Sequence, residues 1–154
     1  MARILIVDDS PSQLAGICRI VEKLGHQTLT ATDGEAGVDM ALQELPDLVL
    51  MDVVMPNLNG FQATRSISRN EATRHIPVIL VTTKNQETDR VWGMRQGARG
   101  YLTKPFSEKE LAEAIAGGLG PDASGGAARP ALGWLAGAGQ IRRQLLPNAF
   151  SRLR

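Results

Sequence analysis

The sequence predicts an α/β fold in which a parallel sheet of five strands carries helices on both of its faces. Short runs rich in β-branched residues or leucine alternate with longer amphipathic segments about five times between residues 1 and 120, which is the pattern of a doubly wound sheet. Three of the short runs are nearly all apolar, as expected for strands that are buried on both faces. We expect strands at residues 3–7, 27–31, 47–51, 78–82 and 100–102.

The first helix is predicted directly after the first strand. Ser10-Pro11 marks its beginning, because proline suits the first turn of a helix. Apolar residues then recur at intervals of three and four residues, which places them on one stripe that faces the sheet. They are Leu14, Ile17, Cys18, Val21 and Leu24.

Four further helices complete the alternation. The middle three are expected at residues 34–45, 58–69 and 86–96. The last of these three ends at Gly97 and is weakened by Gly93 in its centre. Ser107 and Glu110 have the spacing of a capping box and begin the final helix, which runs to Leu119.

The composition indicates an ordinary globular protein. Of the 154 residues, 43% are apolar and 21% are charged, with 17 basic and 16 acidic side chains, so neither disorder nor a polycation is indicated. The single cysteine excludes an internal disulfide and a cysteine-rich zinc site. Because the sequence has no signal-peptide pattern and no run of about 18 apolar residues, we expect a cytoplasmic protein without a transmembrane segment.

The charge pattern divides the chain near Gly120. Residues 1–120 hold 12 basic and 15 acidic side chains, whereas residues 121–154 hold five arginines and one aspartate. The second segment also opens with the composition of a linker, Pro121-Asp-Ala-Ser-Gly-Gly-Ala-Ala-Arg-Pro130. We therefore expect a domain at 1–120 and a Gly/Ala/Arg-rich C-terminal extension at 121–154, either amphipathic and helical or loosely packed. This extension is too short for a helix-turn-helix module, so nucleic-acid binding is not expected.

Polar side chains follow four of the five predicted strands. In an open parallel sheet, ligands bind beyond the carboxyl ends of the strands. Taken singly, each of these residues has a structural explanation as a helix cap, a turn residue or a strand-end residue. Their joint occurrence favours one shared site, and they are Asp8-Asp9 after the first strand, Asp52 after the third, Thr82-Thr83 at the end of the fourth and Lys104-Pro105 after the fifth.

Three carboxylates that converge on one edge of a sheet repel each other and require a cation. Two unit charges about 4 Å apart repel by about 1 kcal/mol in water and by about 4 kcal/mol at an effective dielectric constant of about 20. Oxygen ligands favour a hard cation such as Mg²⁺, and Lys104 adds a permanent positive charge. A carboxylate in such a site can attack phosphorus while these cations neutralise the phosphoryl oxygens. The predicted product is an aspartyl phosphate on Asp52, with the Thr82 hydroxyl bound to the phosphoryl group.

These residues resemble the receiver domain of two-component response regulators. The resemblance covers residues 1 to about 119 and implies a flavodoxin-like, CheY-like fold with the strand order 2-1-3-4-5. The motifs that carry it are Asp8-Asp9, Asp52-Val-Val-Met-Pro56 with Gly60 following, Val81-Thr82-Thr83 and Tyr101-Leu-Thr-Lys104-Pro105.

The resemblance also implies a role for each residue of the site. Asp52 would be the phosphoacceptor. Asp9 would bind Mg²⁺ directly, Asp8 chiefly through water and Val54 through its backbone carbonyl. Lys104 would contact a phosphoryl oxygen, and the bond between Lys104 and Pro105 would be cis.

Thr82 and Tyr101 would form a switch pair in such a domain. When the Thr82 hydroxyl moves to the phosphoryl group, the Tyr101 ring can occupy the vacated space and reshape the surface of the fourth helix, the fifth strand and the fifth helix. We expect this surface to bind the partner. Trp92 lies on the fourth helix, where its ring packs either against the core or outward against that partner.

Two further segments narrow the resemblance. Gly60-Phe-Gln-Ala-Thr-Arg65 and the segment from Thr83 to Gly97 are similar to single-domain regulators of the PilH type, which act in the twitching-motility system of type IV pili. This similarity implies a sensor histidine kinase of the chemosensory type and a downstream protein effector of the pilus system. Those regulators lack an extended tail, so residues 121–154 depart from the pattern.

Two alternatives to an effector switch remain open. A Mg²⁺-dependent phosphatase with an aspartyl intermediate places a second aspartate two residues after its nucleophile. Here that position holds Val54 after Asp52, or Ser10 if Asp8 is the nucleophile, which disfavours turnover of external phosphoesters. A phosphate sink that drains the kinase is the other alternative. We expect a phosphoacceptor that is not an enzyme beyond its own phosphorylation and dephosphorylation.

Overall fold

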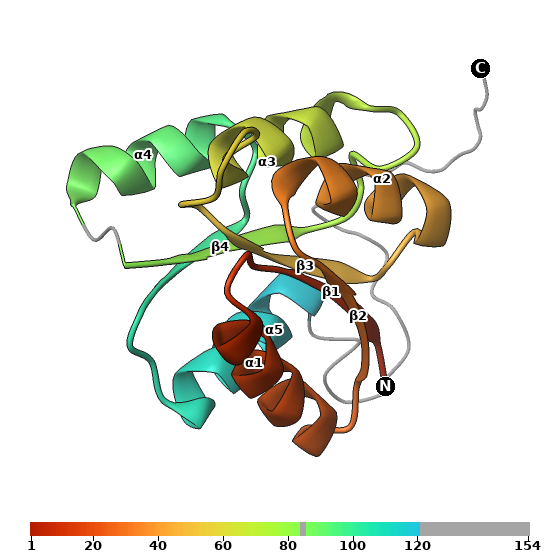
Figure 1. Ribbon diagram of the computed structural model, residues 1–154, viewed down its shortest axis with the longest axis vertical. Coiled ribbons are helices and arrows are strands. Elements are labelled where there is room, and N and C mark those ends of the chain that lie inside the picture. The colour runs from red at the N-terminus through yellow and green to blue at the C-terminus, as the bar shows by residue number, and fades with distance from the viewer. Residues whose placement is uncertain (84–85, 121–154) are drawn as a thin grey trace. The chain divides into compact units, whose positions relative to one another are not determined.

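Five parallel strands in the order β2-β1-β3-β4-β5 form the centre of the structure, a computed structural model that describes residues 1–83 and 86–120 (Figure 1). Helices and strands alternate along the chain, as the sequence predicts. The strands are β1 (Arg3–Val7), β2 (Gln27–Ala31), β3 (Leu48–Asp52), β4 (Val78–Thr82) and β5 (Gly100–Thr103). The helices are α1 (Pro11–Lys23), α2 (Gly34–Glu44), α3 (Gly60–Arg69), α4 (Glu87–Arg95) and α5 (Glu108–Leu119). The predicted fold class and strand order are confirmed.

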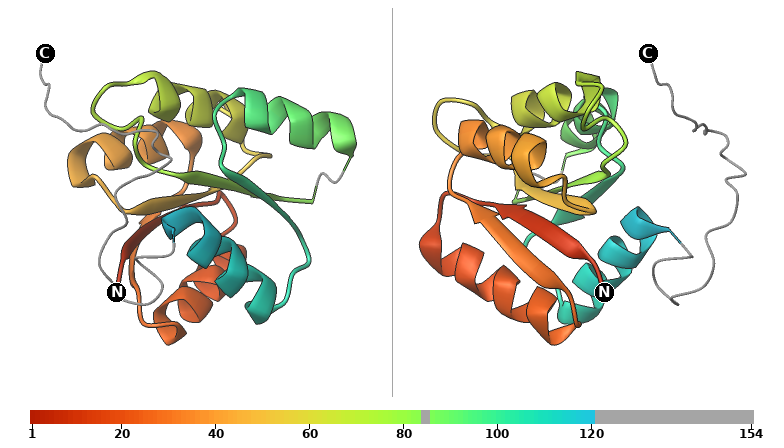
Figure 2. Two further views of the ribbon diagram at one scale, coloured as in Figure 1. Left: turned by 180° about the vertical axis from the view of Figure 1, so that it is seen from behind. Right: turned by 90° about the vertical axis from the view of Figure 1, so that its right-hand side faces the viewer.

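The two faces of the sheet carry separate hydrophobic cores. Helices α2, α3 and α4 cover one face, and α1 and α5 cover the other (Figure 2). Alternate residues of each strand point to opposite faces, so that Leu80 belongs to the core under α3 and α4 whereas Val81 belongs to the core under α1 and α5. All five residues of β3 and of β4 are buried, which accounts for their apolar composition. Cys18 packs against the second core, as its place on the inward stripe predicts.

The ends of several elements differ from the prediction by one or two residues. The third strand begins one residue later than expected, where the Asp47 carboxylate accepts a hydrogen bond from the Arg3 backbone N–H at 2.9 Å. Helix α3 begins at Gly60 because Asn59 and Gln62 form a capping box. The capping box of the last helix has the predicted partners, which are Ser107 and Glu110.

The predicted extension at 121–154 lies outside the described residues. Residues Met1–Leu119 form one compact unit. Within residues 1–83 and 86–120, no helix has the length and apolar character needed to cross a lipid bilayer.

Gly60 brings the start of α3 against the end of β3. Its backbone N–H donates to the Val53 carbonyl at 2.9 Å. A Cβ atom at this position would lie 2.2 Å from the Asp52 carbonyl oxygen and 2.7 Å from the Val53 Cα. Both neighbours are backbone atoms, so a side chain at residue 60 must displace either the helix or the strand that carries Asp52.

We therefore predict that Gly60→Ala lowers the free energy of unfolding by about 2 to 3 kcal/mol, because the new methyl group collides with backbone. Urea denaturation measures the change. The matched control is Gly16→Ala in α1, where a Cβ meets no atom within 4 Å and where alanine favours the helix by about 0.5 to 1 kcal/mol. Equal stabilities for the two variants would contradict the close approach of Gly60.

Candidate functional site

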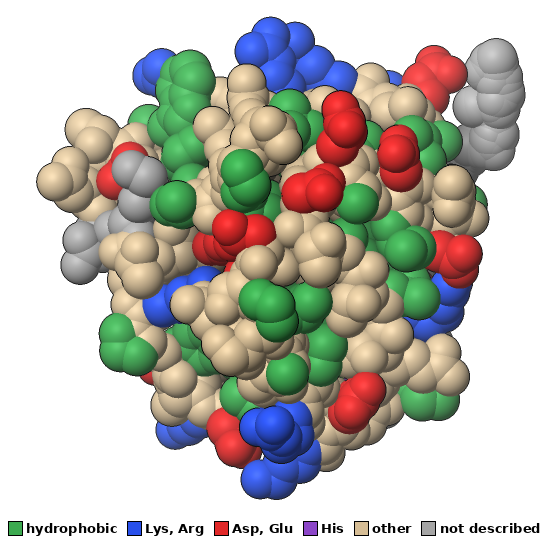
Figure 3. All heavy atoms as spheres, in the orientation of Figure 1, with side chains coloured by type: hydrophobic (Ala, Val, Ile, Leu, Met, Phe, Trp, Pro, Cys, Tyr) green, Lys and Arg blue, Asp and Glu red, His purple; other side chains and the backbone are tan. Residues whose placement is uncertain are grey.

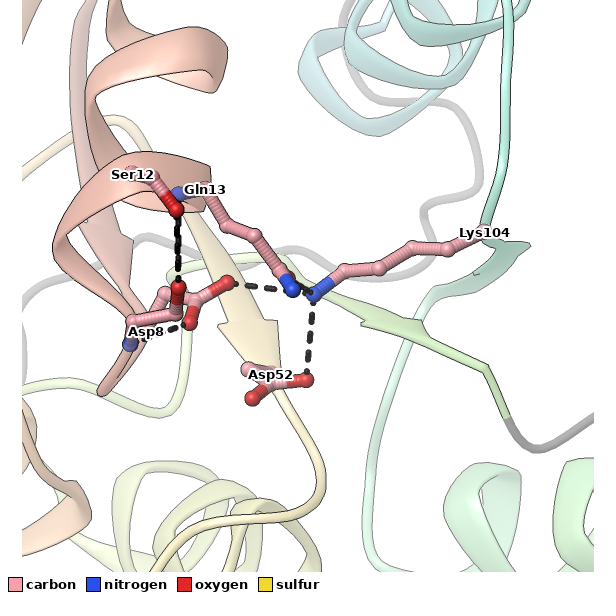
Figure 4. Close-up of polar contacts among 6 residues, drawn as sticks. Asp8, Ser12, Gln13, Asp52 and Lys104 are labelled. Carbon is pink, nitrogen blue, oxygen red and sulfur yellow. Dashed lines mark hydrogen bonds and ion pairs between the residues drawn. The ribbon is translucent and has the colours of Figure 1, made fainter.

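The polar residues predicted for the site meet at the carboxyl edge of the sheet. Asp8 and Asp9 follow β1, Asp52 is the last residue of β3, Thr82 is the last residue of β4, and Lys104 follows β5. Because the sheet is parallel, these ends lie on the same edge. Figure 4 shows Asp8 from β1, Asp52 from β3 and Lys104 from beyond β5 with their polar groups turned toward one another.

The carboxylates of Asp8, Asp9 and Asp52 form a cluster. One oxygen from each lies within 4.8 Å of the others. Asp8 and Asp52 are buried, with 1% and 8% of their surface exposed, whereas Asp9 is exposed. Acidic side chains are visible near the middle of the molecular face in Figure 3. Because Asp9 is exposed, the cluster is open to solvent on one side although Asp8 and Asp52 are nearly enclosed.

Lys104 connects two of these carboxylates. Its Nζ lies 3.1 Å from Asp8 Oδ2 and 3.5 Å from Asp52 Oδ1. The peptide bond between Lys104 and Pro105 is cis, and the Lys104 backbone N–H donates to the Thr82 carbonyl at 2.7 Å. The side chain of Lys104 is only 13% exposed, so its ammonium group acts on the carboxylates with little screening by water.

Gln13 is a site residue that the sequence analysis missed. Its Oε1 accepts a hydrogen bond from Lys104 Nζ (Figure 4). Gln13 lies in the first turn of α1, and the Ser10 side chain accepts from its backbone N–H at the start of that helix. A lone glutamine carries no motif, and only its position four residues after Asp9 relates it to the site.

Burial raises the pKa of Asp52 from its ordinary value of 3.8 to about 6. The positive charge of Lys104 lowers this pKa, and the nearby carboxylates of Asp8 and Asp9 raise it. One ammonium group thus faces three carboxyl groups and does not compensate both burial and mutual repulsion. The charge and the oxygen chemistry of this site fit a hard divalent cation such as Mg²⁺.

Thr82 and Tyr101 lie on the same face of the sheet. In the register of β4 and β5, Tyr101 is opposite Leu80, and Thr82 is two residues beyond Leu80. Paired residues of neighbouring strands share a face, as do residues two apart along one strand. Thr82 is fully buried and Tyr101 is half-buried against the core under α3 and α4. The geometry brings the predicted switch pair to one side of the sheet.

Trp92 lies on the outer side of α4 and is partly open to solvent. Half of its surface is exposed, and the residue lines a shallow hollow on α4 together with Glu87, Thr88, Val91 and Arg95. Trp92 is therefore not a core side chain. Val54 is also exposed and follows β3 in the loop next to Asp52.

The raised pKa of Asp52 predicts a pH-dependent gain in stability for Asp52→Asn when divalent ions are absent. The folded protein binds the Asp52 proton more tightly than the unfolded chain does, so the wild type loses stability as the pH rises through about 6. The variant avoids this loss. We expect its free energy of unfolding to exceed that of the wild type by about 1 to 3 kcal/mol at about pH 7, and the difference to vanish near about pH 4.

Urea denaturation between about pH 4 and pH 8 tests this expectation. Asp39→Asn, which changes an exposed carboxylate on α2, is the control and should show no such gain. A gain of equal size at every pH would contradict the assignment to Asp52.

Comparison with known proteins supports the same interpretation of the chain. Residues 4–116 match the family described as response regulator receiver domain. The chain is 61% identical over 115 residues to Protein PilH of Pseudomonas aeruginosa. This match covers 75% of the chain and 95% of PilH. It is 39% identical over 113 residues to the phosphate regulon transcriptional regulatory protein PhoB of Escherichia coli, and this match covers 73% of the chain and 49% of PhoB.

Two solved structures have a backbone similar to that of this chain. The chemotaxis protein CheY4 of Vibrio cholerae superposes with a TM-score of 0.71 at 29% identity, covering 75% of this chain and 96% of that one. A second structure is the receiver domain of the sensor histidine kinase PA1611 of Pseudomonas aeruginosa, which has a magnesium ion coordinated in its active site cleft. It superposes with a TM-score of 0.73 at 32% identity, and the match covers 78% of this chain and 98% of that domain. With its strand order, its acidic cluster and these matches, the chain belongs to the response regulator receiver domain family.

Proposed function

We propose that this receiver domain accepts a phosphoryl group on Asp52 from the phosphohistidine of a sensor histidine kinase. The observation that carries the proposal is the position of the Asp52 carboxylate, 3.5 Å from Lys104 Nζ at an acidic strand edge. A carboxylate oxygen of Asp52 attacks phosphorus while the P–N bond to the imidazole breaks, and the imidazole keeps the electron pair and takes up a proton. Lys104 neutralises charge on the phosphoryl oxygens.

Four residues would hold Mg²⁺ in this site. They are Asp8, Asp9 and Asp52 with their carboxylates and Val54 with its backbone carbonyl. Bound Mg²⁺ supplies further neutralisation of the phosphoryl oxygens. Support comes from the three clustered carboxylates, from the raised pKa of Asp52 and from the related receiver domain in which magnesium is coordinated in the cleft.

Phosphorylation would reach the surface through Thr82 and Tyr101. The Thr82 hydroxyl binds the phosphoryl group, and the Tyr101 ring turns toward the space that this hydroxyl leaves. The two side chains lie on the same face of the sheet, beneath α3 and α4. Trp92 and its neighbours on the outside of α4 then form the surface that a protein partner reads.

The pathway of this switch is the control of type IV pilus twitching motility. The similarity to Protein PilH over almost the whole of that protein supports this assignment. The phosphodonor is a histidine kinase of the chemosensory type, the partner is a protein effector of the pilus system, and the protein works in the cytoplasm. A phosphate sink in the same pathway uses the same site and differs only in having no effector.

A phosphatase is the less favoured function. Hydrolysis of an external phosphoester through an aspartyl intermediate needs an acid that protonates the leaving group. The residue two positions after Asp52 is Val54, which carries no acid. The domain would therefore catalyse only its own phosphorylation and dephosphorylation.

We predict that acetyl phosphate with Mg²⁺ adds one phosphoryl group per chain, because Asp52 is the acceptor. Intact-mass measurement detects the adduct, and removal of Mg²⁺ with a chelator should prevent it. The isosteric Asp52→Asn variant is the control and should gain no mass. Phosphorylation of that variant, or steady hydrolysis of an external phosphoester by the wild type, would contradict the proposal.

We further predict that Trp92→Ala leaves this phosphorylation unchanged but weakens binding to the effector by about tenfold or more, because an exposed aromatic anchor is lost. The measurement compares proteins retained by immobilised wild type, Trp92→Ala and Asp52→Ala after treatment with beryllofluoride and Mg²⁺. Asp52→Ala should retain no effector. If the wild type itself retains only the kinase, the sink replaces the effector switch.

A further inference from the structure

Arg90 and Tyr101 make a cation–π contact between α4 and the edge strand β5. The guanidinium carbon of Arg90 lies 4.9 Å from the centre of the Tyr101 ring, within the range in which a cation is attracted to an aromatic face. Both side chains are partly buried, which protects the contact from water. Tyr101 is the only tyrosine of the chain.

The same helix also passes close to the edge of this ring at Gly93. Gly93 lies one turn after Arg90, so the two residues share a face of α4. A Cβ atom at Gly93 would lie 3.6 Å from Tyr101 Cδ2 and 2.5 Å from Leu80 Cδ1. The absence of a side chain at Gly93 thus lets α4 pass close to the edge of the ring, while Arg90 lies over its face.

Charges on α4 also reach the Tyr101 hydroxyl. Burial raises the pKa of Tyr101, the carboxylate of Asp89 raises it further, and Arg90 acts against both. Arg90 thus contacts the face of the ring and also lowers the pKa of the Tyr101 hydroxyl.

We propose that Arg90 is a positioning residue that holds Tyr101 in the resting orientation and thereby opposes switching. This inference rests on the proposed role of Thr82 and Tyr101 as a switch pair. In this proposal the resting orientation is the one with the ring under Arg90, and turning toward Thr82 would move the ring away from the guanidinium and break the contact. An interaction present in only one of two states shifts the equilibrium between them. Loss of Arg90 should therefore favour the phosphorylated arrangement before any phosphoryl group is bound.

The test uses the full chain with 3-fluorotyrosine incorporated, so that one ¹⁹F signal reports on Tyr101. Beryllofluoride with Mg²⁺ is the phosphoryl analogue, and its concentration dependence gives an apparent affinity. We expect Arg90→Met, which keeps the length of the side chain but removes its charge, to bind the analogue roughly two- to fivefold more tightly than the wild type. Arg90→Lys, which retains a cation, should lie between them. Arg69→Met changes an exposed arginine on α3 and should match the wild type.

The outcomes separate this inference from the function on which it rests. If beryllofluoride shifts the wild-type signal but Arg90→Met binds it no more tightly, the role of Arg90 is overturned and the switch remains. If beryllofluoride binds without moving the wild-type signal, the switch itself is overturned and the role of Arg90 with it. An equal gain in affinity for Arg69→Met would also overturn the inference, because the effect would then come from the loss of a positive charge anywhere on the domain.

Discussion

The ion pairs of Lys104 connect strands that are far apart in the sequence. Asp8 follows β1 and Asp52 ends β3, yet one ammonium group from beyond β5 lies within 3.5 Å of both carboxylates. The backbone of the same residue is bonded to the end of β4 through the Thr82 carbonyl. The ends of four of the five strands are thus connected through one residue, by its side chain and its backbone. This long-range contact depends on the parallel arrangement, because only parallel strands deliver all of these residues to one edge.

The charges at the carboxyl edge of the sheet do not balance. A single ammonium group faces three carboxyl groups, two of them buried, and the pKa of Asp52 remains raised to about 6. Such an arrangement is unfavourable for the protein alone and favourable once a cation is added. The stability of the domain and the chemistry of its site are therefore linked, since the same unbalanced carboxylates that destabilise the metal-free fold are the ligands and the nucleophile of the proposed reaction.

Much of the fold follows from local patterns in the sequence. The alternation of apolar runs with amphipathic segments predicts each strand and helix, and the residues at the strand ends predict the cluster of Asp8, Asp52 and Lys104, because strand direction alone fixes where they meet. The strand order came from the family resemblance. Gln13 was not predicted, since its contact with Lys104 joins segments 91 residues apart and it lies in no motif. The contact of Arg90 with Tyr101 was not predicted either, because it depends on how α4 packs beside β5. The exposure of Trp92 depends on how α4 is turned against the sheet, which periodicity left undecided.

Helix α4 is attached to the rest of the domain in an unusual way. All of its residues are described, and Gly93 alone among them is buried. The residue that makes the closest approach to the sheet is thus the one that supports a helix least, and no side chain caps the first turn. A helix that buries few apolar groups opens locally at a low free-energy cost. Helix α4 is consequently the helix that encloses the fewest residues against the sheet, and its place depends less on buried side chains than that of its neighbours.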